Sequence, residues 1–336
     1  MNTDKSCQHQ TPEYILGFIT HFQKSRTLLT AFELNIFTVL KDGPKTSSEV
    51  AETIKTDKRA TDRLMNAVCA IGFLEKNNGK FSNTETTKKY FVKDSSEYMT
   101  GLMHTLNLWN SWSNLTGSIY KGGTINQLPS DNKDIREKWL ESFIGAMHYR
   151  ALIHVPEVIS KIDLNGVRRV LDVGGGSGAF AMGFTKANEN IKATVFDLPE
   201  VTSITKEYIQ KDNLTDKVNI VNGDYNSDHL PKEYDIVFLS SIVHSNSYEG
   251  NMRLIKKCAD SLNPGGQIII QDIVMNEDRT TPENGALFAL NMLVNTEKGD
   301  TYTEKEMLEW FENANIRFEK RVESFMGNSL LIGRKR

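Results

Sequence analysis

The chain has 336 residues, which is enough for one large domain or two ordinary domains with a sizeable core. A formal net charge of -3, with no basic block of five or six residues, gives no indication of a nucleic-acid partner. Cys7, Cys69 and Cys258 are odd in number and far apart, which is typical of a reduced intracellular protein. The polar start Met1–Gln10 lacks a signal core, and no apolar run approaches the roughly 18 residues of a membrane span. We therefore expect a soluble cytoplasmic protein.

The first ~100 residues have a helical pattern that ends in a hairpin. Apolar residues at helical spacing from Tyr14 to Phe37 predict one or two helices. Ser47 or Ser48 opens a further short helix, and Asp57–Ile71 forms another. The segment Phe73–Ser82 then predicts a hairpin with Asn and Gly at its turn. Helices followed by a small hairpin indicate a winged helix.

A winged helix raises the alternative of a DNA-binding or ligand-sensing regulator. A helix that enters the major groove usually carries a net positive face, because phosphate neutralisation supplies most of the affinity. The helix Asp57–Ile71 instead mixes basic and acidic side chains. We interpret these charges as a solvated face.

Two segments that follow, Glu97–Lys121 and Trp139–Ile162, are helical in pattern and rich in aromatic residues and methionine. Such segments form core, or they roof a pocket for a flat apolar ligand. From Val167 onward the pattern alternates between strands and helices. This alternation predicts an α/β fold with a mostly parallel, doubly wound sheet. The expected strands are Val170–Val173, Ala193–Phe196, Val218–Asn222, Ile236–Leu239 and Gln267–Ile273, the last entered by a turn at Asn263–Gly266, and an antiparallel pair of Phe318–Ser324 with Ser329–Gly333.

The glycine-rich stretch after the first of these strands is the strongest functional signal. Val170–Val173 is followed by a tight glycine turn and by the expected helix Ala179–Ala187. Backbone N–H groups and a helix N-terminus can approach a ligand closely there. An acid about 20 residues beyond such a turn, here Asp197, normally binds a ribose diol. The pattern predicts a cofactor that contains a nucleoside.

The spacing of Asp172, Gly174, Gly176 and Gly178 differs from the G-x-G-x-x-G of nicotinamide-binding proteins. An acid directly before the turn repels a pyrophosphate but suits a cationic ligand with a free ammonium group. The arrangement resembles motif I of the S-adenosylmethionine-dependent methyltransferases. A dinucleotide, or a glycine turn that merely packs a helix on a sheet, remains the alternative.

From about Pro12 to Arg336 the chain is similar to the S-adenosylmethionine-dependent O-methyltransferases of the caffeic-acid and acetylserotonin type, with their bacterial relatives. The motifs that carry the resemblance are Ala31–Phe37, Ala70–Leu74, Leu171–Gly178, Phe196–Pro199, Gly223–Tyr225 and Asn263–Gly266. The resemblance implies a winged-helix dimerisation domain in residues 1–100 and a methyltransferase domain in residues 101–336. Residues 101–162 would be a helical linker and pocket roof, and the protein a homodimer.

The same resemblance implies which side chains bind the cofactor. Asp172, Gly174 and Gly176 belong to the cofactor loop, and Asp197 takes the ribose hydroxyls. Asp224 and Tyr225 would flank the adenine, while Ser240 falls where plant members often have a lysine near the cofactor. The implied cofactor-binding set is Asp172, Gly174, Gly176, Asp197, Asp224, Tyr225 and Ser240.

His244 is the candidate general base, because it follows the fourth strand at the place where the family has its base. Asp272 is at the matching place for the acid that fixes the imidazole tautomer. Thr301 stands where plant members have a second, glutamate partner, and Ser245 and Asn246 replace the Asp and Trp after the base. These departures keep two alternatives open: methylation of carbon or nitrogen, and a non-transfer reaction such as decarboxylation or hydroxylation.

The acceptor pocket is expected on segments that line the acceptor cavity in the family. Its candidate residues are Trp109, Phe143, Met147, Phe288, Met292 and Leu293, each of which can also be plain core. Such a lining suits a flat aromatic or polyketide-like molecule. Because no His/Cys/Asp cluster has metal-ligand spacing, we expect a metal-independent reaction. The resemblance implies that this reaction is O-methylation of a small aromatic or polyketide-like acceptor.

Overall fold

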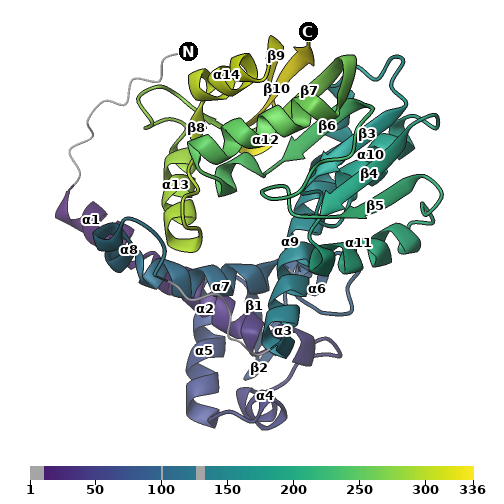
Figure 1. Cartoon of the computed structure of the whole chain (residues 1–336). Coiled ribbons are helices and arrows are strands. Elements are labelled where there is room, and N and C mark those ends of the chain that lie inside the picture. Colours follow the sequence, from purple (N-terminus) through teal and green to yellow (C-terminus); the bar gives the residue numbers. More distant parts are fainter. Residues whose placement is uncertain (1–10, 100, 126–132) are drawn as a thin grey trace. The chain divides into compact units, whose positions relative to one another are not determined.

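The structure is a computed structural model that describes residues 11–99, 101–125 and 133–336. It divides into two compact units, Met1–Leu106 and Asn107–Arg336, which are described separately (Figure 1). Cys7 and the polar start Met1–Gln10 lie outside the described residues. Among the described residues, every helix is too short or too polar to cross a membrane.

Unit 1 is mainly helical and contains the predicted hairpin. Asn78 and Gly79, both with positive φ, make the turn between its antiparallel strands, as hairpin turns of this kind require. The predicted one or two helices at the start are three shorter helices, because Asn35 adopts a left-handed conformation before the third. The elements are α1 (Pro12–Thr20), α2 (Phe22–Glu33), α3 (Ile36–Val39), α4 (Ser47–Ile54), α5 (Lys58–Ala70), β1 (Leu74–Asn77), β2 (Lys80–Asn83), α6 (Glu85–Tyr90) and α7 (Leu102–Ser113), which runs into unit 2.

Thr46, and not Ser47 or Ser48, caps helix α4. Its hydroxyl oxygen accepts a hydrogen bond from Glu49 N at 3.3 Å, and the Glu49 carboxylate accepts one from Thr46 N at 2.7 Å. The helix begins at Ser47, one of the two predicted starts, and this reciprocal capping box makes Thr46 the capping residue.

Within the described residues, unit 2 holds an eight-stranded sheet in the order β5-β4-β3-β6-β7-β10-β9, with β8 paired to β7. Strands β3 to β7 are parallel and β9 and β10 are antiparallel, so the predicted doubly wound sheet with an antiparallel edge is confirmed. The strands are β3 (Arg169–Val173), β4 (Lys192–Asp197), β5 (Val218–Asn222), β6 (Tyr234–Ser240), β7 (Leu262–Met275), β8 (Tyr302–Thr303), β9 (Ile316–Glu323) and β10 (Asn328–Lys335).

Two details of the sheet differ from the sequence prediction. The segment Asn263–Gly266, predicted as a turn before the fifth strand, falls within β7 as an irregularity of the pairing, because Tyr234 pairs with Leu262 and Ile236 with Gln267. The two-residue strand β8 was not predicted, since a strand so short has no periodic pattern of its own.

Different helices cover the two faces of the sheet (Figure 1), and side chains that alternate along the strands pack under them. Leu171 and Val173 of β3 pack on the side covered by α12 and α14. Val170, which precedes Leu171 and points to the opposite face, packs on the side covered by α9, α10 and α11. The remaining elements are α8 (Leu115–Lys121), α9 (Lys133–Ser160), α10 (Ala179–Ala187), α11 (Pro199–Lys211), the 3-10 helix η1 (Val243–Ser245), α12 (Tyr248–Ser261), α13 (Glu283–Asn295), α14 (Glu304–Asn313) and the 3-10 helix η2 (Phe325–Gly327).

The strand order reverses between β3 and β6. From β3 the chain continues to β4 and β5 on one side, and later to β6 and β7 on the other. Open parallel sheets bind ligands outside the carboxyl ends of the strands at such a switch point. The glycine turn after β3 and His244 after β6 both follow the strands that flank this point.

Candidate active site

The glycine turn after β3 has the backbone that the sequence predicts. Gly174 and Gly176 have φ of 66° and 55°, in the left-handed region where residues with a Cβ are disfavoured. Gly174 N donates to the carbonyl of Phe196 at 2.8 Å, which holds the turn against the end of β4. A Cβ at Gly174 would collide with Ile242 Cδ1 and would lie 3.8 Å from Tyr225 Cε1. At Gly174 the turn therefore forms a cradle with room for backbone only.

Asp197 lies at the end of β4 against this turn. Its Oδ2 accepts a hydrogen bond from Gly176 N at 2.8 Å, and its Oδ1 accepts one from Leu198 N at 2.8 Å. Burial raises the pKa of Asp197, and the two backbone N–H groups oppose that rise. The structure thus brings together the glycine turn and the acid that were predicted to share a ligand.

Asp172 has a different environment from the one expected of a ligand contact. Its side chain is buried, and Oδ2 accepts a hydrogen bond from Ala181 N, in the first turn of α10, at 3.2 Å. Burial raises its pKa to about 7, and the nearby charge of Asp197 adds to the rise. Asp172 therefore partners the N-terminus of α10, and its contact with a cofactor ammonium stays a prediction.

The loop after β5 brings Asp224 and Tyr225 to the same place. Gly223 N donates to the carbonyl of Asp197 at 3.0 Å, so the loop begins beside the ribose candidate. Tyr225 Cε1 lies 3.8 Å from the place where a Cβ on Gly174 would stand, and the Tyr225 hydroxyl donates to Asn246 Oδ1 at 3.4 Å. Burial raises the pKa of Tyr225, which keeps the phenol neutral.

Ser240, at the end of β6, is bonded within the sheet. Its hydroxyl donates to Gln271 Oε1 of β7 at 3.0 Å. This contact joins two neighbouring strands, and a role of Ser240 at the cofactor stays a prediction.

His244 and Asp272 form the pair that was predicted to activate the acceptor. His244 lies in η1, and Asp272 lies inside β7, which runs on beyond it to Met275. His244 Nδ1 is 2.9 Å from both carboxylate oxygens of Asp272, and Asp272 Oδ2 also accepts from His244 N at 3.4 Å. The carboxylate fixes the proton on Nδ1, because it can only accept. Nε2 is then the nitrogen with a free lone pair.

The segment before β8 packs directly on His244. Asp300 N donates to the carbonyl of His244 at 3.0 Å, and the Phe288 ring stands edge-on to the imidazole with centroids 4.8 Å apart. Thr301, at the position of the family's second acid, is buried, and its hydroxyl donates to the carbonyl of Gly285 at 3.4 Å. The acid that holds the imidazole is therefore Asp272, on β7.

Asn246, which replaces an aromatic residue of the family motif, stabilises the turn that carries His244. Its Nδ2 donates to Asn251 Oδ1 at 3.2 Å, and Asn251 Nδ2 donates to the carbonyl of Val243 at 2.8 Å. The Tyr302 hydroxyl donates to the carbonyl of Asn246. A polar network thus takes over the positioning of η1.

The predicted acceptor residues lie on three helices of unit 2. Phe288 contacts His244, as described, and Met292 on the same helix α13 is buried. Trp112 Nε1 donates to Asn291 Oδ1 at 3.0 Å and so ties α7 to α13. The others are half-buried: Trp109 on α7, Phe143 and Met147 on α9, and Leu293 on α13. Their contact with an acceptor stays a prediction.

Sequence reasoning placed His148 only in the pocket roof, but the structure joins it to the glycine turn. His148 Nδ1 lies 2.8 Å from Ser177 Oγ, and its ring stacks on Tyr208 with centroids 3.9 Å apart. Burial lowers the pKa of His148 to about 4, so the imidazole is neutral at pH 7. A single histidine on an apolar helix gives no sequence signal for this contact.

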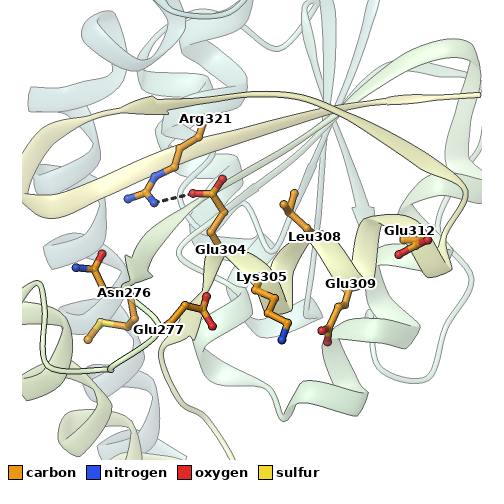
Figure 2. Close-up of a pocket in the computed structure, with 9 residues that line it drawn as sticks. Asn276, Glu277, Glu304, Lys305, Leu308, Glu309, Glu312 and Arg321 are labelled. Carbon is orange, nitrogen blue, oxygen red and sulfur yellow. Dashed lines mark hydrogen bonds and ion pairs between the residues drawn. The ribbon is translucent and has the colours of Figure 1, made fainter.

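A surface hollow of about 760 Å³ lies elsewhere on unit 2, over α14 and the end of β7 (Figure 2). Glu304 and Arg321 form an ion pair of 2.8 Å on its wall. Its described lining residues are Met275, Asn276, Glu277, Glu304, Lys305, Leu308, Glu309, Glu312 and Arg321, and the predicted site residues are not among them. No group of three or more potential metal ligands occurs in the described parts of the chain.

A doubly wound parallel sheet, a glycine turn after β3 and a half-buried acid at the end of β4 define the class of Rossmann-like proteins that bind a nucleoside cofactor. The O-methyltransferase domain family matches residues 127–317, and the O-methyltransferase dimerisation domain matches residues 16–93. The chain therefore belongs to the O-methyltransferase family, whose members use S-adenosylmethionine as methyl donor.

Individual relatives agree with this assignment. The chain is 29% identical over 307 residues to the 3-hydroxy-5-methyl-1-naphthoate 3-O-methyltransferase of Streptomyces sahachiroi, covering 90% of this chain and 89% of that protein. The structure of PigF with SAH, a Serratia protein, is similar with a TM-score of 0.89 at 22% identity, covering 97% and 100% of the two chains. Human N-acetylserotonin methyltransferase in complex with SAM gives 0.83 at 24% identity, with 98% and 99% covered.

The residues after β3, β4 and β5 fit S-adenosylmethionine. The turn accepts a ligand against its backbone because Gly174 and Gly176 leave no side chain there. The Asp197 carboxylate lies against Gly176 N, and Tyr225 lies beside Gly174; a ribose that binds a carboxylate and an adenine that stacks on a ring would fit these residues. S-adenosylmethionine contains no pyrophosphate, so the buried acid Asp172, directly before the turn, has no phosphate charge to repel.

Proposed function

We propose that this enzyme methylates a hydroxyl group of a small, flat aromatic or polyketide-like acceptor, with His244 as general base. The observation that carries the proposal is the contact of His244 Nδ1 with both oxygens of buried Asp272 at 2.9 Å. This contact presents a basic Nε2 at the switch point of the sheet. The edge-on ring of Phe288 adds an apolar surface beside that nitrogen.

The chain's own residues have three tasks in this reaction. Gly174, Gly176 and Asp197 hold the cofactor, which supplies an electrophilic methyl group and a thioether leaving group when bound. His244 Nε2 accepts the proton of the acceptor hydroxyl, and Asp272 stabilises the imidazolium that forms. A positioned base of this kind contributes about 10²–10⁴-fold to the rate.

The aromatic acceptor is supported by the lining and by the relatives. The half-buried side chains Trp109, Phe143 and Met147, with Phe288 and Met292, supply the flat apolar surfaces that such an acceptor needs. The Streptomyces sahachiroi relative is named for a hydroxylated naphthoate, which is a fused aromatic acceptor.

We also propose that the protein is a cytoplasmic homodimer that assembles through the domain of residues 1–100, with residues 101–336 as the catalytic domain. The dimerisation-domain match supports assembly, and so do the side chains that α1 exposes, of which Leu16, Phe18 and Ile19 are 57–65% exposed. The free thiols of Cys69 and Cys258 agree with a reducing compartment.

Calorimetric titration with S-adenosylmethionine and S-adenosylhomocysteine tests the cofactor site. We expect micromolar binding that Asp197→Ala removes, because the carboxylate beside Gly176 N is lost. Hydroxynaphthoates then serve as the first acceptors, with His244→Ala as the control that binds cofactor but releases no S-adenosylhomocysteine. Absence of binding to either ligand in the wild-type protein would overturn the proposal.

A further inference from the structure

The loop after β5 closes around the ammonium group of Lys257, a residue of α12. Lys257 Nζ donates to three backbone carbonyl oxygens: those of Tyr225 at 2.8 Å, Asn226 at 3.0 Å and Asp228 at 2.9 Å. An ammonium group has three N–H donors, so this arrangement uses all of them. Hydrogen bonds from a charged donor are also shorter and stronger than neutral ones.

Lys257 differs in this respect from the lysine next to it. Lys256 is exposed on the same helix, whereas Lys257 is half-buried with its ammonium group in the loop. The loop lies about 30 residues earlier in the sequence, and the long side chain of Lys257 reaches it. A lysine on an amphipathic helix normally contributes only charge and solubility, so a three-carbonyl contact indicates a structural task.

The same loop carries the two residues proposed to flank the adenine. Asp224 N donates to Asp228 Oδ2 at 2.8 Å, and Asn226 N donates to Asp224 Oδ1 at 2.8 Å. The carbonyls of the loop are thus bonded to Lys257, while these amides are bonded to the loop's own carboxylates. The Asp224 carboxylate and the Tyr225 ring are placed by the conformation of this loop. The Lys257 ammonium group holds that conformation through its three bonds to loop carbonyls.

We propose that Lys257 is a positioning residue for the adenine side of the cofactor site, and this inference rests on the proposed function. It contacts the carbonyl of Tyr225 and acts on the cofactor only through the loop. Without the ammonium group, three carbonyl oxygens face one another with no donor, and their repulsion opens the loop. The Tyr225 ring then leaves its place beside Gly174.

The test compares Lys257→Met with Lys256→Met, which makes the same change on the exposed neighbour. Each protein is titrated with S-adenosylhomocysteine and with S-inosylhomocysteine, in which a carbonyl oxygen replaces the 6-amino group of adenine. The wild-type protein should prefer the adenine compound, because the Asp224 carboxylate accepts from an amino group and repels a carbonyl.

For Lys257→Met we expect the Kd for S-adenosylhomocysteine to rise about tenfold, which corresponds to about 1.4 kcal/mol. The preference for adenine over hypoxanthine should shrink at the same time, while Lys256→Met keeps both wild-type values. Lys257→Arg retains the charge but presents a planar group, so an intermediate loss of preference is expected. If the Met variant does not fold, the Arg variant carries the comparison.

Three results would overturn the inference. The first is a Lys257→Met protein with wild-type Kd values. The second is an equal loss of affinity for both compounds, which indicates general loosening rather than adenine positioning. The third is an equal effect of Lys256→Met. A wild-type protein that binds neither compound refutes the proposed function itself, and this outcome is distinct from the other three.

Discussion

Replacing Asp272 by asparagine is the sharpest test of the proposed base. The Asp272 side chain is 3% exposed, and it accepts from His244 Nδ1 through both oxygens at 2.9 Å. Asparagine has the same shape but offers one acceptor and one donor. The variant therefore admits the other imidazole tautomer, in which Nε2 carries the proton and cannot act as a base. It also removes the negative charge beside the imidazolium.

The size of the effect follows from this geometry. Two unit charges 2.9 Å apart at an effective dielectric constant of about 20 attract each other by about 6 kcal/mol. If half of the imidazolium charge has formed in the transition state, losing the carboxylate costs about 3 kcal/mol, or about 10²-fold in kcat. The wrong tautomer adds to this loss. We expect Asp272→Asn to lower kcat by about 10²–10⁴-fold.

The assay is the initial rate of S-adenosylhomocysteine formation with a hydroxynaphthoate acceptor at saturating cofactor. Asp260→Asn makes the same chemical change on the exposed surface of α12 and should keep the wild-type rate. Cofactor affinity, measured by calorimetry, should be unchanged in Asp272→Asn because the pair contacts the acceptor side. Combining Asp272→Asn with His244→Ala should add little to His244→Ala alone.

A kcat within about twofold of wild type in Asp272→Asn would refute the reasoning, given the about 10²-fold minimum estimated from the charge pair. Full additivity of the two substitutions would refute it as well, because it would mean that Asp272 acts independently of His244.

Two further predictions concern the glycine turn. The folded-state pKa of Asp172, about 7, lies above its ordinary value of 3.8, so the wild-type protein loses stability as the pH rises from about 4 through 7, by up to about 4 kcal/mol. The side chain of the Asp172→Asn variant cannot ionise. Its free energy of unfolding in urea, relative to that of the wild-type protein, should therefore be higher at pH 8 than at pH 5. Equal differences at the two pH values contradict the raised pKa of Asp172. Gly174→Ala should weaken S-adenosylhomocysteine binding, whereas Gly265→Ala, also at positive φ but in open space, should cost only stability. Equal Kd values for the two variants would contradict a cradle at Gly174.

The sequence was sufficient to predict the parallel strands of the sheet and the edge at which Asp197 and His244 lie, but it did not predict the short strand β8. Buried strands with alternating helices determine a parallel sheet, and the carboxyl ends of parallel strands meet at one edge. Residues at or shortly after the carboxyl ends of strands, such as Asp197 and His244, could therefore be placed at the same edge of the sheet as the glycine turn.

Side chains whose partners come from distant segments could not be placed in the same way. Lys257 has the pattern of a solvated helix residue, and its three carbonyl partners become visible only when α12 packs beside the loop after β5. His148 likewise meets Ser177 only after α9 packs on the sheet. For Asp172 the local motif predicted a contact with a ligand, but in the fold its carboxylate accepts a hydrogen bond from Ala181 N in the first turn of α10.

The contact of His148 with Ser177 has a practical consequence for changing what this enzyme methylates. Helix α9 carries Phe143 and Met147, which are proposed to face the acceptor, and the same helix is anchored to the turn between Gly176 and Gly178. Substitutions that shift α9 to admit a larger acceptor will also pull on that turn and raise the KM for the methyl donor. A library on α9 screened at limiting donor would discard variants whose acceptor range has improved. Screening at saturating donor, followed by a second round at Ser177 and its neighbours, separates the two effects.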